Sequence, residues 1–156
     1  MSNVQRISPT EPLPICHSWP LADQPRRFEL GLILSCTVTD IIEPSEVGAL
    51  GIHHAGCWEC DLADESLGWS GGVHDIFGLP RGVKVTREEA VGFYAEHSRA
   101  TMERLRAYAI RHKRGFTIDA EIWPATGGAS RSMRLIAAPL CDGDKVVRLH
   151  GLKLII

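Results

Sequence analysis

Apolar and polar residues alternate along a central stretch of the chain, residues 57–62, with the sequence CWECDL. Alternation of this kind places every second side chain on one face and predicts a half-buried strand. The polar stretch 63–66 predicts a tight turn, after which residues 67–70 can return as an antiparallel strand. In residues 71–78, apolar side chains recur at helical spacing and a glycine follows the last of them, so we expect a short helix there.

Two further helices are indicated in the next part of the chain. Thr86 is followed three residues later by Glu89, which is the spacing of a capping box at the start of a helix. Residues 97–114 have the pattern of the longest helix, with one apolar stripe and arginines on the opposite face. We expect Ser98 to cap this helix and Gly115 to end it.

Three strands are predicted to close the fold. Residues 116–123 alternate apolar and polar side chains, and the apolar-rich stretches 131–140 and 145–156 follow. The glycine-containing stretches 124–130 and 142–144 separate the strands and predict hairpin turns. Antiparallel strands joined in this way pack one face against a core and expose the other, so the pattern predicts a mixed α and β domain.

The N-terminal part of the chain has a different composition. Residues 1–27 are dense in proline, which disrupts helices and removes backbone donors. We therefore expect a flexible or extended arm, with Trp19 and Phe28 as side chains that can anchor it to the sheet or to a partner. Residues 28–51 are expected to form an extension, either strand or helix. Its apolar residues 30–34 need cover, which makes the extension a candidate dimer contact.

Composition and charge limit the classes of partner. The 156 residues and 44 % hydrophobic content suit one folded domain with a tail. The formal net charge of −2 gives no electrostatic reason to expect nucleic acid or an anionic membrane as partner. The stretch 1–14 lacks the apolar core of a secretory signal, and the longest apolar run, 30–36, is too short to span a bilayer. We therefore expect a cytoplasmic protein.

One cluster of metal-ligand residue types stands out. His53, His54, Cys57 and Cys60 form an HHxxCxxC pattern, which is suggestive of zinc. In a strand, however, two cysteines three residues apart point to opposite faces. One metal ion cannot easily take both thiolates, so we expect no structural metal.

Three short motifs follow one another in the order Gly56-x-Trp58-x-x-Asp61, Trp69-Ser70 and Ile76-Phe77-Gly78-Leu79-Pro80. This order resembles the opening of a PAS sensor domain, of the type found in bacterial histidine kinases and diguanylate cyclases. The resemblance covers residues 52–156. It implies an α+β fold with a five-stranded antiparallel sheet, helices packed on one face and a small central cavity, preceded here by the N-terminal extension.

The end of the chain departs from the family pattern. Many members end with an Asp-Ile-Thr motif that couples the last strand to an output helix, whereas this chain ends in KLII at residues 153–156. Direct relay within the chain is therefore in doubt. We expect the signal to pass through a homodimer or through another polypeptide, such as a histidine kinase or a response regulator.

The resemblance also implies where a ligand would bind, between the inner sheet face and the long helix. The same side chains can equally form a filled core. The candidate lining residues are Trp69, Phe77, Met102, Leu105, Ile118, Ile122, Met133 and Leu135.

The resemblance raises two cofactors that occur in the family, haem and flavin. In haem-binding relatives a histidine of the long helix binds the iron, which makes His97 and His112 haem candidates. In light-sensing relatives the reactive cysteine lies in an Asn-Cys-Arg-Phe type of motif, and none of the five cysteines does so here. Covalent flavin photochemistry is not expected, while non-covalent flavin, or no cofactor, remains open.

The function predicted from these features is that of a sensory module in signal transduction that binds a small ligand or a partner protein. No nucleophile elbow, P-loop or dinucleotide fingerprint occurs, so we expect no enzyme activity. The alternatives are a haem- or flavin-binding sensor, an inert dimerisation adaptor, or a small α+β enzyme. The last would need a buried polar group in the cavity, for which Asp119 and His150 are the candidates.

Overall fold

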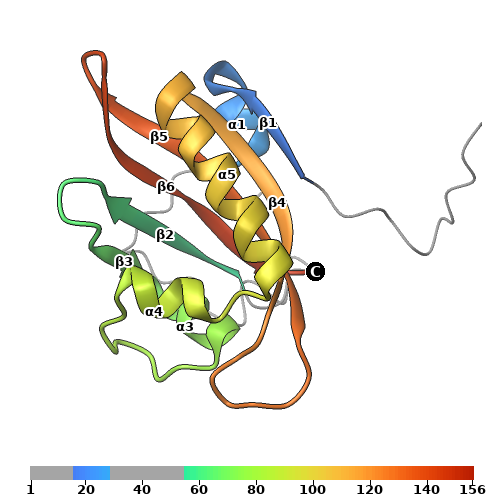
Figure 1. Ribbon diagram of the computed structural model, residues 1–156. Coiled ribbons are helices and arrows are strands. Elements are labelled where there is room, and N and C mark those ends of the chain that lie inside the picture. Colours follow the sequence, from blue (N-terminus) through green and yellow to red (C-terminus); the bar gives the residue numbers. More distant parts are fainter. Residues whose placement is uncertain (1–15, 29–54) are drawn as a thin grey trace, which may run out of the picture.

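The computed structural model describes residues 16–28 and 55–156 (Figure 1). A six-stranded sheet runs through the described part in the order β1-β4-β5-β6-β2-β3, and all its neighbouring strands are antiparallel. The strands are β1 (Cys16–Pro20), β2 (Ala55–Asp61), β3 (Leu67–Trp69), β4 (Arg114–Ile122), β5 (Arg131–Asp142) and β6 (Lys145–Ile155). The helical segments are η1 (Leu21–Asp23), α1 (Gln24–Arg27), α3 (Gly71–Phe77), α4 (Arg87–Gly92) and α5 (Glu96–His112).

The predicted α+β fold with an antiparallel sheet and helices on one face is confirmed. Figure 1 shows α3, α4 and α5 on the same side of the sheet, with α5 lying across β4 and β5. The sheet has six strands in place of the expected five, because β1 pairs along the free edge of β4 from Cys16 opposite Ile118 to Pro20 opposite Arg114. Apart from Phe28, the expected extension 28–51 lies outside the described residues.

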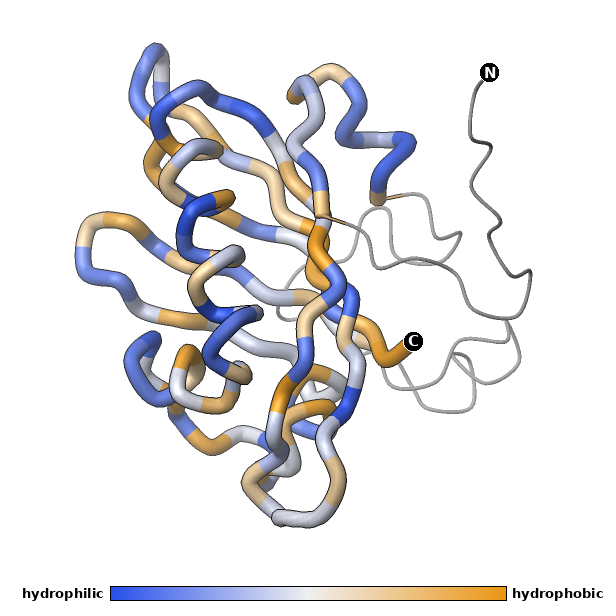
Figure 2. Tube along the Cα trace, turned by 45° about the vertical axis from the view of Figure 1, so that its right-hand side comes forward, coloured by the Kyte–Doolittle hydropathy of each residue, from blue (hydrophilic) through white to orange (hydrophobic). Residues whose placement is uncertain are grey.

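The inner face of the sheet, which carries these helices, holds the larger hydrophobic core. Alternate residues of β4, beginning with Phe116 and Ile118, point into it as their periodicity predicts. Figure 2 shows α5 as largely hydrophilic. Among its side chains, only those of Ser98, Met102 and Ala109 are buried. The long helix therefore covers the core with a narrow stripe and leaves most of its surface to solvent.

The predicted start of α4 is correct, whereas the predicted start of α5 is wrong. The capping box of Thr86 and Glu89 at the start of α4 is confirmed. The helix α5 instead begins after Ala95, so the expectation for Ser98 was wrong. The Ser98 hydroxyl lies within the first turn and accepts a hydrogen bond of 2.9 Å from the backbone N–H of Glu121, which ties the helix to the sheet.

The prediction that Gly115 ends α5 was also wrong. The helix ends at His112, and Lys113 takes the left-handed conformation with φ 56°. Gly115 lies in β4 opposite Trp19, and a Cβ atom there would overlap the Trp19 ring. The glycine therefore makes room for an indole that comes from the N-terminal segment.

A second, smaller hydrophobic cluster lies on the outer face of the sheet. Trp19 and Phe28 pack there with their rings edge to face, at a centroid distance of 6.5 Å. The indole N–H of Trp19 donates a hydrogen bond of 3.0 Å to the hydroxyl of Thr117. In this way both expected anchor residues cover apolar side chains of β5 and β6, among them Ile136 and Leu152.

We expect Gly115→Ala to lower the free energy of unfolding by about 1–3 kcal/mol, because the added methyl group overlaps the ring of Trp19. The control is Gly92→Ala in α4, where a Cβ atom meets nothing within 4 Å and alanine favours the helix by about 1 kcal/mol or less. Urea unfolding of both variants measures the effect. Equal midpoints for the two variants would contradict this role of Gly115.

Candidate functional site

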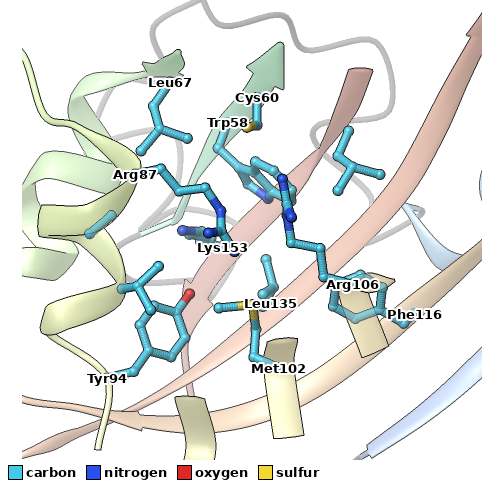
Figure 3. Close-up of a pocket in the computed structure, with 13 residues that line it drawn as sticks. Trp58, Cys60, Leu67, Arg87, Tyr94, Met102, Arg106, Phe116, Leu135 and Lys153 are labelled. Carbon is cyan, nitrogen blue, oxygen red and sulfur yellow. The ribbon is translucent and has the colours of Figure 1, made fainter. Parts of the chain in front are cut away.

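A pocket of about 50 Å³ lies between the inner face of the sheet and the helices α4 and α5 (Figure 3). A water-sized group needs roughly 10–15 Å³ of such space, so the pocket has room for about three to five of them. Its walls carry aromatic and aliphatic side chains and a few cationic ones. The lining residues are Trp58, Cys60, Leu67, Arg87, Ala90, Val91, Tyr94, Met102, Arg106, Phe116, Leu135, Leu149 and Lys153.

The charged end of Lys153 lies among aromatic rings at this pocket. The residue belongs to β6 and is only 6 % exposed. Its Nζ atom lies 4.9 Å from the ring centroid of Phe77, 5.3 Å from that of Trp58, 5.4 Å from that of Trp69 and 5.9 Å from that of Tyr94. Ring faces at these distances attract a cation, which offsets part of the free energy that its burial costs.

The contacts of the Lys153 ammonium are with aromatic rings, and it has no hydrogen bond or ion pair within the part of the chain that the structure describes. Its burial lowers the pKa of Lys153 to about 7, and a negative charge on Cys60 acts in the opposite direction. A lysine almost never lies buried without a partner for its charge. The ammonium therefore provides an unused binding group on the pocket wall.

Two arginines extend the positive charge of the pocket. Arg87 pairs with Glu103, and Arg106 donates a hydrogen bond of 2.7 Å to Oε2 of Glu65. Figure 3 shows Arg87, Arg106 and Lys153 directing their nitrogen-bearing ends toward the pocket from three different elements. Since both guanidinium groups have carboxylate partners, the ammonium is the uncompensated charge of this group.

The other polar atoms of the site are mainly donors. The indole Nε1 atoms of Trp58 and Trp69 are buried without a hydrogen-bond partner. Burial raises the pKa of the Tyr94 hydroxyl well above its usual value, and burial likewise raises the pKa of the Cys60 thiol. Both groups therefore keep their protons at neutral pH. No carboxylate is among the described residues that line the pocket, so the site suits a ligand rich in acceptor atoms.

Some of the predicted pocket residues lie at this site and others do not. Met102 and Leu135 line the pocket. Trp69 and Phe77 belong to the rings around Lys153, and they stack on each other at a centroid distance of 4.8 Å. The remaining candidates pack in or against the inner core: Leu105, Ile118, Ile122 and Met133.

Sequence reasoning missed Lys153, which was read only as part of the last strand. The available signal was its position in an apolar strand, where it shares the inward face with Leu149 and Ile155. A lysine at an inward position of a predicted core strand is unusual. That mismatch between residue type and alternation was sufficient to single it out.

The two haem candidates lie outside the pocket. His97 is exposed in the first turn of α5, with its Nε2 atom 3.7 Å from a carboxylate oxygen of Glu121. His112 is exposed in the last turn and packs against the Tyr108 ring at 4.3 Å between centroids. The lining contains no histidine, and its volume is far below the roughly 300–1,000 Å³ of pockets that hold larger ligands. Neither haem nor flavin fits this cavity.

The other groups considered from the sequence also lie elsewhere. Asp119 accepts hydrogen bonds of 2.7 and 3.1 Å from Arg134 on the neighbouring strand. His150 packs against Phe28 at 5.3 Å between ring centroids, on the outer face. Neither of these candidates for a polar group in the cavity lines the pocket.

The cysteines of the HHxxCxxC pattern separate as the strand geometry predicts. Cys57 belongs to the outer cluster and Cys60 to the inner core. His53 and His54 lie outside the described residues. Within residues 16–28 and 55–156, no group of three or more histidine, cysteine, aspartate or glutamate side chains is placed to hold a metal ion.

Comparison with known proteins identifies the fold. No protein-family model matches the sequence, and no curated protein does. Among solved structures, the N-terminal PAS sensor domain of a diguanylate cyclase from Marinobacter aquaeolei is similar, with TM-score 0.58 and 13 % identity, over 65 % of this chain and 94 % of that one. A sensory box histidine kinase/response regulator from Burkholderia thailandensis gives TM-score 0.57 and 16 % identity, over 73 % and 85 %.

A third similar structure is an RNA-binding light-oxygen-voltage receptor, with TM-score 0.59 and 14 % identity over 65 % of this chain. The chain spans only 29 % of the length of that receptor. The three structures match this chain over 65–73 % of its length. The chain therefore has the PAS fold, as the order of its sequence motifs indicated. No helix in the described ranges is long and apolar enough to cross a membrane.

We expect stability to rise with pH above neutrality because of Lys153. Its pKa is about 7 in the folded chain against 10.5 for the free side chain. Between these values the unfolded chain binds more protons, so unfolding becomes less favourable by up to about 1.4 kcal/mol per pH unit. Lys153→Met should remove this contribution and be more stable than the wild type at pH 7.

Urea unfolding at pH 7 and pH 9 measures the effect as a difference between wild type and variant. The other titratable or charged groups that face the ammonium, Cys60, Arg87, Tyr94 and Arg106, are present in both proteins, so their direct contributions largely cancel. The same change in stability from pH 7 to pH 9 in both proteins would show that Lys153 keeps an ordinary pKa.

Proposed function

We propose that the chain is a sensory module of signal transduction that binds a small organic anion, such as a short-chain carboxylate, in the pocket beside Lys153. The observation that carries the proposal is the buried ammonium without a partner among the described residues. A carboxylate would supply the missing charge and accept hydrogen bonds in a site of low dielectric constant, where such bonds are strong.

The rest of the pocket supports the same class of ligand. The unpartnered indole N–H of Trp58 and the hydroxyl of Tyr94 are further donors for carboxylate oxygens. Met102 and Leu135 provide apolar contacts for a short hydrocarbon part. The volume of about 50 Å³ favours a ligand of only a few non-hydrogen atoms.

A ligand at this place would touch several elements at once. Lys153 belongs to β6, Arg87 begins α4 and Arg106 lies in the middle of α5. Binding that draws these groups together favours the conformations in which the helices lie close to the sheet. The proposed signal is this shift in the position of α4 and α5 against the last strand.

The output is proposed to pass through other protein chains. Two similar structures are a sensory box histidine kinase/response regulator and a domain of a light and redox sensing histidine kinase from Haloarcula marismortui. This similarity supports a histidine kinase or response regulator as the partner. The proposal includes a cytoplasmic homodimer that has no enzyme activity of its own. The expected dimer contact of residues 30–34 falls outside the described residues.

Titration calorimetry with acetate, propionate and lactate tests the proposal. We expect at least one of them to bind the wild type, and Lys153→Met to weaken its affinity by about tenfold or more. Lys145→Met is the matched control, because Lys145 is an exposed lysine at the start of the same strand. The proposal fails if none of the three binds, or if the two variants bind equally well.

A further inference from the structure

Lys153 has the surroundings of a reactive amine as well as those of a charge partner. Its side chain is buried, its Nζ atom lies between aromatic rings at 4.9–5.9 Å, and it lines a cavity. Lysines that are desolvated in apolar pockets are the ones that form Schiff bases with carbonyl compounds. The nucleophile is the neutral amine, and burial increases the fraction of Lys153 side chains that are neutral.

The size of this increase is large enough to matter at neutral pH. With a pKa of about 7, about half of the Lys153 amines are neutral at pH 7. An ordinary lysine, with a pKa near 10.4, has only about one neutral amine in 2,500 at that pH. The described surface lysines, such as Lys145, have no comparable enclosure.

We infer that Lys153 captures a small carbonyl compound that carries a carboxylate, such as a 2-oxo acid or an aldehyde acid, as a reversible imine. The inference rests on the proposed function, because the carboxylate is the part that the cationic pocket attracts. Arg87 and Arg106 direct their guanidinium groups toward the same space from α4 and α5. The carbonyl group is the part that reacts covalently with the Lys153 amine.

The chemistry needs no oxidant or reductant. The lone pair of Nζ attacks the carbonyl carbon, and the nitrogen passes a proton to the carbonyl oxygen, which gives a carbinolamine. Loss of that hydroxyl group as water, with one added proton, leaves a protonated imine. Hydrolysis reverses each step and returns the free lysine and the carbonyl compound.

Neighbouring groups suit this sequence of steps. The Tyr94 hydroxyl, whose raised pKa keeps it protonated, lines the same pocket and can donate a hydrogen bond to the carbonyl oxygen. The protonated imine keeps its positive charge at the nitrogen, so the rings of Phe77 and Trp58 continue to stabilise it. Cys60 is the competing nucleophile, and burial holds it as the thiol, which is its less reactive form.

The test uses the full chain, with glyoxylate as the probe and cyanoborohydride to trap any imine. Intact-mass measurement should show one reduced adduct that forms at least about tenfold faster than modification of other lysines, and peptide mapping should place it at Lys153. Lys153→Arg should remove this fast adduct, and Cys60→Ala should retain it. Lys153→Met, which also lacks the amine and is expected to be more stable than the wild type at pH 7, serves as the second variant if Lys153→Arg does not fold.

The results separate this inference from the proposed function. If acetate or lactate binds at the site but glyoxylate leaves no fast adduct at Lys153, the imine is excluded and simple anion binding stands. A fast reduced adduct that persists in Lys153→Arg would also overturn the inference, because another amine would then be the reacting group. If neither the carboxylates nor glyoxylate interact with the pocket, both proposals fall together.

Discussion

Burial of one positive charge inside the hydrophobic core is the constraint that shapes this structure. The Lys153 ammonium lies on the inner face of the sheet, where the closing strand meets the aromatic side chains of β2, β3 and α3. Several rings share the electrostatic stabilisation of the charge, and their packing in turn leaves an incompletely filled space beneath α4 and α5. The core therefore stabilises the domain and, among the described residues, also holds its one buried lysine.

Local patterns were sufficient for most of the fold. The alternation in residues 57–62 and 116–123 and the capping box of Thr86 and Glu89 depend on residues that are close in sequence, and all of these elements form. The PAS-like order of motifs added the overall arrangement, which periodicity alone does not supply. Within the candidate site, this reasoning placed Met102 and Leu135 at the pocket.

The features that escaped prediction depend on contacts between distant parts of the chain. Gly115 resembles a helix-ending glycine until Trp19, 96 residues earlier in the sequence, is found packed against it. The inward position of Lys153 can be read from the strand pattern, but the aromatic rings around its ammonium come together only when β6 is placed between β5 and β2. Ser98 was misjudged for the same reason, since its partner is the backbone of β4 and not that of its own helix.

The strand that the N-terminal segment adds has a consequence for association between molecules. Exposed sheet edges are templates on which another chain can add a strand, and this is a common route to aggregation. Here β1 replaces the longer β4 as one border of the sheet, and both borders are short, with five residues in β1 and three in β3. Continuous intermolecular sheets are thereby disfavoured in the described part of the chain, which leaves the largely hydrophilic helical layer as a broader surface for contact with another protein.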